Sequence, residues 1–467
     1  MKKNIFFLLI SGLLIFQSCM KEFLEIKHDF SKTIPTKLED YRAILDNSNL
    51  MNNFSSHSLG ILGGDEVYVR DQVFNSSSRL AWEKNAYIWE KDVFGMLAVP
   101  DWDYGYKRIL HANVVLDGLK TISTEPKEKD VSDEIKGAAY FFRAFNFLQL
   151  SDLFSNQFEK ANAENTLGIP LRLESDITLP VKRNSLKHTY DQIIADLDLA
   201  IQLLPSHVEV KERPSRAAAQ ALLSRVYLQM EDYEKALKYA ELTLDEDVAL
   251  LDYNSLDLSG NPNSNGSYFI FEGWQQHNPE VLFMNSSAGI GLIQTFVGGN
   301  MTMDTILMKS YQENDLRKKV FFKTSEDTDA FIGTYTGYGG TFTGLAVDEV
   351  YLIRAETACR LNKLDLALAS LNTLLVARHD ATFRALELKD KERLLERIIL
   401  ERRKELVFRG VRWADLKRLN KDPRFATNLI KELNGVKYEL KANDLRYIWP
   451  LPYLSILQSG LEDNPRY

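Results

Sequence analysis

Apolar side chains recur with the spacing of an α-helix along most of this chain. The spacing predicts helices over 104–120, 132–154 and 189–204, where apolar positions lie three or four residues apart. The helix at 132–154 is apolar almost all round, so we expect it to lie at the centre of the protein. Thr189 and Gln192 have the spacing of a capping box and predict the start of the third helix.

Two later segments, 216–244 and 348–375, resemble one another. Mostly small residues recur in them at matched spacings: Ser224, Tyr227 and Ala236 in the first, and Ala355, Ala358 and Ala367 in the second. Each segment also has a turn in its middle. This pattern resembles the tetratricopeptide unit, in which small side chains let two paired helices approach closely. Because the two copies are far apart in the sequence, we expect helix pairs that are interleaved with other material.

Two stretches, about 47–103 and 250–345, have a different composition. They are rich in Asn, Ser, Gly and aromatic residues and show little helical period, although 268–271 and 281–283 have the character of short strands. Their apolar content argues against disorder, and long irregular loops are often functional. The sequence therefore predicts a helical scaffold, over about 104–245 and 346–420, with two large irregular insertions.

The N-terminus has the pattern of a bacterial lipoprotein signal peptide. Two lysines precede an apolar run over 5–16, which is too short to span a bilayer. The small residue Ser18 stands directly before Cys19, as at a lipoprotein cleavage site. We therefore expect a signal peptide over 1–18, acylation of Cys19 and a polar tether over 19–40. An ordinary signal peptide followed by a chance cysteine is the alternative.

The charge and cysteine content narrow the class of protein. The chain carries a net charge of −8, and removal of the two lysines of the signal peptide takes it to −10. Such an acidic protein is unsuited to nucleic acid and to electrostatic binding of anionic lipid. The chain has two cysteines, so acylation of Cys19 leaves Cys359 without a partner and no intrachain disulfide is expected.

The segment 394–420 is the most distinctive part of the sequence. Opposite charges lie three residues apart on its helix in two pairs: Glu401 with Lys404, and Arg402 with Glu405. Gly410 is suited to cap this helix, and a second helix is expected to start near Trp413. Since no His or metal-ligand spacing accompanies these charges, we interpret the segment as a structural corner and not as a catalytic site.

This stretch closely resembles the SusD/RagB family of Bacteroidetes outer-membrane lipoproteins, and the resemblance covers nearly the whole mature chain. Matching motifs occur in the family's order: 137–145, 190–205, 216–219, 401–418, Trp449-Pro450-Leu451-Pro452 and Asn464-Pro465-Arg466-Tyr467. The sequence departs from the family at two of the compared places. Arg409 stands where many relatives have Glu, and Phe154-Ser155 replaces a common Tyr-Gly.

The resemblance implies a mostly α-helical SusD-like fold, with tetratricopeptide-like hairpins and an irregular ligand-binding half, in one domain over 41–467. Proteins of this family are lipid-anchored at the outer surface of the outer membrane. They capture oligosaccharides, or peptides in the RagB type, for a SusC-like TonB-dependent transporter. The resemblance therefore implies a binding protein without enzymatic activity or a cofactor.

Aromatic residues in the irregular insertions are the candidate ligand contacts, because flat rings pack on the apolar faces of sugars. The candidates are Trp82, Tyr87, Trp89, Trp274, Tyr335 and Tyr338. For each of them, burial under a long loop is the alternative. Glycines flank the two last tyrosines, so their loop has little to pack on. No acidic spacing indicates a metal site, and Asp65-Glu66 and 326–329 have the character of solvated turns.

Two other classes of protein stay open. A surface glycoside hydrolase needs two carboxylates across a cleft, and 65 acidic residues leave room for such a pair. A scaffold that holds protein partners through its helix pairs is the second, although the separation of the two pairs disfavours it. No motif in the sequence specifies which glycan is bound.

Overall fold

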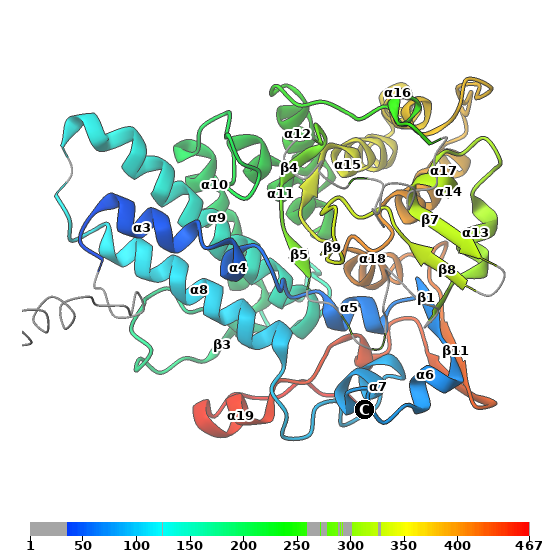
Figure 1. Cartoon of the computed structure of the whole chain (residues 1–467). Helices are drawn as coiled ribbons and strands as arrows, with labels where there is room; N and C mark the ends of the chain where they lie inside the picture. The colour runs from blue at the N-terminus through cyan, green and yellow to red at the C-terminus, as the bar shows by residue number, and fades with distance from the viewer. Residues whose placement is uncertain are drawn as a thin grey trace, which may run out of the picture.

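The computed structural model describes residues 35–123, 125–258, 271, 278–287, 290, 292, 301–325 and 328–466 (Figure 1). The predicted signal peptide, Cys19 and most of the predicted tether lie outside the described residues, as does Trp274. The helix α3 (Leu38–Leu45) begins within the last residues of the predicted tether.

The N-terminal part of the scaffold is helical, as predicted. Its helices are α8 (Pro100–Gly118), α9 (Lys129–Phe154), α10 (Leu186–Leu203), α11 (Arg216–Gln229) and α12 (Tyr233–Leu244). The central helix α9 is buried along most of its length and packs against both α8 and α10 (Figure 1). Pro100 stands in the first turn of α8, where its missing N–H leaves no hydrogen bond unmade.

The start of α10 differs from the prediction. The helix begins earlier, because the Ser185 hydroxyl accepts a hydrogen bond from the N–H of His188 (3.1 Å). The capping box predicted at Thr189 and Gln192 is therefore wrong, since both residues lie inside the helix. Pro205 follows the C-terminal end of α10, as its position in the sequence predicts.

The two segments that resemble one another both form helical hairpins. In the first, α11 packs against α12, and in the second, α15 (Val347–Arg360) packs against α16 (Leu364–Arg378). The small residues expected at the contacts are buried: Ser224, Ala236, Ala355, Ala358 and Ala367. Glu231 and Asn362 take positive φ values of 57° and 62° in the two turns. The hairpins also pack on each other through α12 and α15.

The strands are short and pair antiparallel in twos. The pairs are β1 (Val67–Val69) with β6 (Met301–Met303), β2 (Leu167–Pro170) with β3 (Arg183–Ser185), β4 (Val281–Phe283) with β10 (Leu345–Ala346), β5 (Ser286–Ser287) with β9 (Thr341–Phe342), β7 (Phe322–Ser325) with β8 (Thr328–Phe331) and β11 (Leu429–Leu433) with β12 (Val436–Leu440). The strand predicted at 281–283 is confirmed as β4. Ser55 also bridges Ser287, so the two irregular insertions meet at the centre of the molecule.

Other helices are short, and most of them lie in the irregular segments. They are α4 (Ser48–Met51), α5 (Ser58–Gly63), α6 (Asp71–Asn75), α7 (Ala81–Tyr87), α13 (Thr305–Ser310), α14 (Arg317–Phe321), α19 (Tyr453–Ser459) and the 3₁₀ turns η2 (Pro126–Glu128), η3 (Tyr253–Ser255) and η4 (Leu445–Tyr447). Within the part of the chain that the structure describes, no helix has the length and apolar character needed to cross a membrane.

The charged motif near the C-terminus forms a corner between α17 (Lys391–Glu405) and α18 (Arg412–Leu419). Phe408 and Gly410 take positive φ values of 56° and 75° in the turn between them. The prediction that Gly410 caps α17 is therefore wrong, because the helix ends at Glu405. Gly410 instead shapes the turn that leads into α18. Trp413 lies in α18, as expected, and stacks on Trp449 with ring centroids 5.3 Å apart.

Buried ion pairs hold this corner. The predicted pair of Glu401 and Lys404 is confirmed at 3.2 Å. The predicted pair of Arg402 with Glu405 is wrong, because each side chain finds a partner on another element. The observed partners are Asp415 (2.8 Å) for Arg402, and Arg317 (2.9 Å) and Arg378 (2.7 Å) for Glu405. Burial makes such tertiary partners necessary, since an unpaired buried charge costs several kcal/mol.

The acidic residues Asp65 and Glu66 are not a solvated turn, so that prediction is wrong. Asp65 accepts a hydrogen bond from Nε of Arg412 (2.7 Å). Glu66 is 2% exposed, and its Oε1 accepts the N–H of Phe408 (2.9 Å). Both residues therefore attach the segment before β1 to the corner of α17 and α18. The second cluster, 326–329, lies partly outside the described residues.

Candidate ligand-binding site

Four of the six candidate aromatic residues lie in the protein interior. They are Trp82, Tyr87, Trp89 and Tyr335. Their rings pack against the protein's own side chains, so burial, the alternative considered for each, is the arrangement that the structure shows. Trp274 lies outside the described residues, and Tyr338 is at the surface.

Tyr87 and Trp89 enclose a buried lysine of the protein itself. The Lys431 Nζ atom lies 3.8 Å from the centre of the Tyr87 ring and 4.6 Å from the Trp89 ring. It also donates hydrogen bonds to the carbonyl oxygens of Leu62 (2.6 Å) and Tyr87 (3.0 Å). Burial holds the pKa of Lys431 well below its usual value. These two rings therefore support the strand β11 from inside.

Tyr335 lies at a junction of buried hydrogen bonds. Its hydroxyl donates to Glu280 (2.7 Å) and lies 3.2 Å from a carboxylate oxygen of Asp348 and 3.0 Å from the hydroxyl of Tyr253. Burial raises the pKa of Glu280 to about 7, although the nearby Arg378 opposes the shift. This tyrosine therefore fixes the loop that follows it to the helical scaffold.

Tyr338 presents its ring to solvent in the glycine-rich loop, with 44% of the residue exposed. Its hydroxyl lies 3.2 Å from Oδ1 of Asn53 and 3.2 Å from Oγ of Ser286. A Cβ on Gly340 would lie 2.8 Å from the Tyr338 ring, so this glycine lets the ring lie close to the backbone. The ring is thus oriented by contacts at both of its ends.

A second surface ring, which the sequence reasoning did not select, lies in the neighbouring segment. Phe54 is 42% exposed and stacks on Tyr104 of α8, with ring centroids 5.1 Å apart and an angle of 16° between the rings. Asn53, which binds the Tyr338 hydroxyl, precedes Phe54 directly. The Asn53–Phe54 segment therefore contacts both Tyr104 of α8 and Tyr338 of the glycine-rich loop. We call Asn53, Phe54, Tyr104 and Tyr338 the aromatic platform.

The backbone of Phe54 is strained and firmly held. Its φ of 59° lies in the left-handed region, which phenylalanine rarely adopts. The Arg108 guanidinium donates to the Phe54 carbonyl (2.8 Å) and to the Ser56 hydroxyl (3.1 Å), and the N–H of Ser55 donates to Ser286 (2.9 Å). Strain of this kind persists where surrounding contacts enforce it, and it is common at binding sites.

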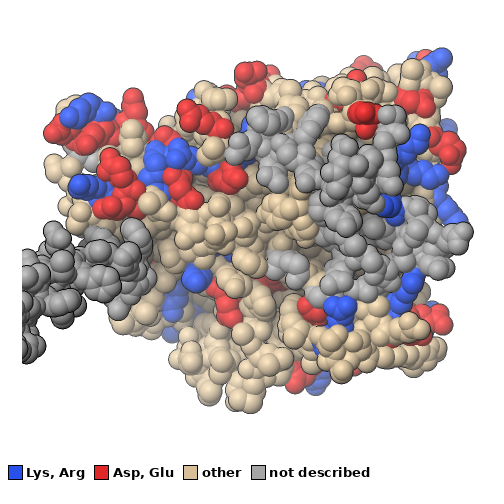
Figure 2. Space-filling model, in the orientation of Figure 1, with Lys and Arg blue, Asp and Glu red and all other residues tan. Residues whose placement is uncertain are grey.

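Buried polar groups support the same segment from below. The Asp101 carboxylate accepts the N–H groups of Ser58 (3.2 Å) and Leu59 (2.7 Å) at the start of α5. Burial raises the pKa of Asp101 to about 6. Figure 2 shows one face of the molecule, and the residues over its middle are mostly uncharged. Figure 1, in the same orientation, places α4 and the chain that leads to α5 there. The platform thus offers flat apolar rings beside amide and hydroxyl groups, on a rigid support.

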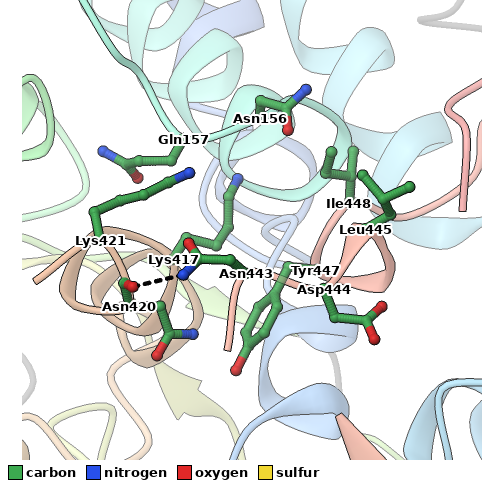
Figure 3. A pocket seen from close by; sticks show the side chains of 10 residues that line it. All are labelled: Asn156, Gln157, Lys417, Asn420, Lys421, Asn443, Asp444, Leu445, Tyr447 and Ile448. Atoms are coloured by element: carbon green, nitrogen blue, oxygen red, sulfur yellow. Dashed lines mark hydrogen bonds between the residues drawn. The ribbon is translucent and has the colours of Figure 1, made fainter. Parts of the chain in front are cut away.

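A second candidate is a small depression between the end of α9, α18 and η4 (Figure 3). Its walls are rich in carboxamides: Asn156, Gln157, Asn420 and Asn443. Its lysines already have partners, because Lys417 donates to two backbone carbonyls at 2.7 and 2.8 Å and Lys421 pairs with Glu159 (2.5 Å). The single aromatic residue among its lining residues, Tyr447, is buried. The depression therefore lacks the exposed rings that the platform has.

Among the described residues, no group of three or more His, Cys, Asp or Glu side chains is placed to hold a metal ion. The described parts of both insertions supply aromatic and amide groups at the platform instead. The arrangement of these groups is suited to non-covalent binding of a ligand with alternating apolar and hydroxyl-bearing faces.

Two family models match most of the chain between them. A model described as "Starch-binding associating with outer membrane" matches residues 22–228, and a model described as "SusD family" matches residues 302–467. The first matched range contains Asn53, Phe54 and Tyr104, and the second contains Tyr338. The platform is therefore built from both matched parts.

Comparison over most of the chain also finds SusD-like proteins. The chain is 23% identical to the SusD-like protein P2 of Formosa agariphila over 430 residues, which cover 78% of this chain and 80% of the relative. A structure described as a putative sugar binding protein of Bacteroides vulgatus covers 93% of this chain and all of its own, with 23% identity and a TM-score of 0.73. A SusD superfamily protein of Bacteroides thetaiotaomicron covers 92% of this chain and all of its own, with 20% identity and a TM-score of 0.73.

Proposed function

The chain belongs to the SusD/RagB family, and from this premise we propose that it is a cell-surface lipoprotein that captures oligosaccharides. We propose further that Cys19 carries the lipid anchor in the outer membrane, and that the bound ligand passes to a SusC-like TonB-dependent transporter. In this proposal the protein binds its ligand and does not cleave it. The description of the family model that matches residues 22–228 supports both the carbohydrate and the membrane location.

The observation that carries the proposal is the aromatic platform. Phe54 stacks on Tyr104, and the neighbouring Asn53 carboxamide bonds to the hydroxyl of the exposed Tyr338. A sugar ring has apolar C–H faces, which pack on aromatic rings, and hydroxyl groups at its edges, which bond to amides. Because the strained backbone at Phe54 is held by Arg108, the platform needs little ordering when a ligand binds.

Calorimetric titration with a panel of glycans tests this assignment. The panel includes maltoheptaose, because starch is the ligand in the family description. We expect Phe54→Ala and Tyr338→Ala to weaken binding by about 1 to 2 kcal/mol each, which is about five- to thirty-fold, without a change in the circular dichroism spectrum. Trp274→Ala belongs in the same series, because the sequence predicts that this residue contacts the ligand.

The matched control is Leu457→Ala, which removes an exposed apolar side chain from α19, outside the platform. Unchanged affinity in both platform variants would reject the site. Binding of peptides and of no glycan in the panel would favour the RagB-type alternative. Release of shorter sugars from a bound glycan would instead identify a surface glycoside hydrolase.

The anchor and the partner are tested in membranes. Incorporation of a palmitate analogue into the wild-type protein, and its loss in Cys19→Ser, are the results expected for a lipidated Cys19. Wild-type protein that sediments with the outer membrane without the label would reject lipidation. Co-purification of a TonB-dependent barrel from detergent-solubilised membranes is expected, whereas recovery of soluble proteins alone would point to a general scaffold.

A further inference from the structure

The tip of the loop that carries Tyr338 is exposed, whereas the residues on either side of the tip are buried. A Cβ on Gly339 would meet nothing within 4 Å. The hydroxyls of Thr334 and Thr336 both donate to the carbonyl oxygen of Gly340, at 2.7 and 2.8 Å. These bonds close the loop on itself. The pairing of β9 with β5 and the side chains packed beneath the loop set its position relative to the rest of the protein.

Arg409 packs against both ends of this loop. Its guanidinium carbon lies 4.5 Å from the ring centre of Tyr335 and 4.5 Å from that of Phe342. Its two terminal nitrogens donate to the two carboxylate oxygens of Asp348, at 3.0 and 3.4 Å. The residue is 6% exposed. The two rings also contact each other, with centroids 5.3 Å apart. A planar cation that is fixed by a carboxylate and packs against both rings adds a restraint on each of them.

The turn that contains Arg409 also contacts the other half of the platform. Gly410 has a positive φ, and a Cβ on it would lie 2.4 Å from Cδ2 of His57. The Nδ1 atom of His57 lies 3.0 Å from the Ser55 hydroxyl, and Ser55 follows Phe54 directly. One turn between α17 and α18 therefore contacts the segments that carry both exposed rings.

We propose that Arg409 is a positioning residue, which sets the place of Tyr338 relative to Phe54 by linking the two ends of the glycine-rich loop to Asp348. What the platform binds rests on the proposed function, but the positioning itself is a property of the free protein.

Fluorine NMR of the ligand-free protein tests the proposal. All tyrosines are replaced by 3-fluorotyrosine, and the resonance of Tyr338 is assigned by its absence in Tyr338→Phe. We expect Arg409→Met to shift or broaden the Tyr338 resonance. Arg409→Lys keeps the positive charge but lacks the planar fork, so it should restore the resonance only in part.

Arg143→Met is the matched control. Arg143 is also 6% exposed, donates to both carboxylate oxygens of Asp196 (2.7 Å each) and lies over the Tyr140 ring, but it joins α9 to α10. We expect this variant to change the Tyr140 resonance and to leave that of Tyr338 in place. An equal effect of both variants on Tyr338 would mean general destabilisation and would overturn the proposal.

A Tyr338 resonance that is unchanged in folded Arg409→Met would also overturn it. If that variant does not fold, the double variant Arg409→Met/Asp348→Asn removes the carboxylate left unpaired, and the same shift or broadening is expected there. An unchanged resonance in the double variant counts against the proposal in the same way. A platform that binds no glycan would defeat the proposed function and would leave these NMR results as they are.

Discussion

Glu66→Gln tests how burial controls the pH dependence of stability. The Glu66 side chain is buried, and burial raises its pKa from an ordinary value of 4.5 to about 7, against the opposing charges of Arg403 and Arg412. Because the pKa is raised, the stability that this group contributes is fully present below pH 4.5. That contribution is lost as the pH rises through 7, since the folded protein then has to carry a buried charge.

The size of this effect follows from the shift. A difference of about 2.5 pKa units corresponds to about 3 kcal/mol in total, of which about 2.5 kcal/mol develops between pH 5 and pH 8. Glutamine resembles the protonated acid and keeps an oxygen to accept the N–H of Phe408. Glu66→Gln is therefore expected to match the wild type near pH 5 and to be the more stable protein at pH 8.

Guanidinium denaturation of both proteins at pH 5, 6, 7 and 8, at constant ionic strength, measures this difference. Glu432→Gln is the control, because it removes the same charge from an exposed position on β11. For the control we expect a difference from the wild type that does not change with pH. A difference between Glu66→Gln and the wild type that stays constant, or that has the opposite sign at pH 8, would refute the reasoning.

Three further variants are expected to lower the free energy of unfolding in denaturation experiments. Lys431→Met leaves two buried carbonyl oxygens without their donor and should cost about 3 kcal/mol; an unaltered midpoint would contradict this. Gly410→Ala forces a Cβ into a left-handed turn with a close contact, and a loss below about 1 kcal/mol would count against the strain. Although burial opposes the shift, Arg225 and Arg402 lower the pKa of Glu349 to about 2, so its contribution of about 3 kcal/mol is lost as the pH falls below 4.5. Glu349→Gln should therefore flatten the acid limb of the stability curve, and an unchanged acid limb would exclude this role.

The helical part of the fold is readable from the sequence because its signals are local. The period of apolar residues predicted α9 and α10, and matched small residues predicted the two hairpins that α11 and α15 begin. The capping box predicted at Thr189 was wrong, because Ser185, four residues earlier, caps the helix by accepting the N–H of His188. Helical spacing predicted a pair of Arg402 with Glu405, but each side chain is paired with a residue of another element. A buried charge is neutralised by the element that packs against it, and the periodicity of a sequence does not show which element that is.

The candidate site was harder to predict, because exposure is a property of the assembled protein. Composition selected Tyr87 and Trp89, yet both rings surround Lys431, which comes from a strand far along the chain. Tyr338 was selected for its flanking glycines, which are a local signal, and it lies at the surface. Phe54 was missed because its exposure and its stacking on Tyr104 depend on contacts between segments that are far apart in the sequence.

The Ser286 hydroxyl donates to the Asn53 carboxamide across 233 residues of sequence. A contact of such long range forms only after the intervening chain has closed a large loop, so it comes late in folding. The platform is therefore complete only in the whole fold, since neither half of the chain alone holds Asn53, Phe54 and Tyr104 together with Tyr338.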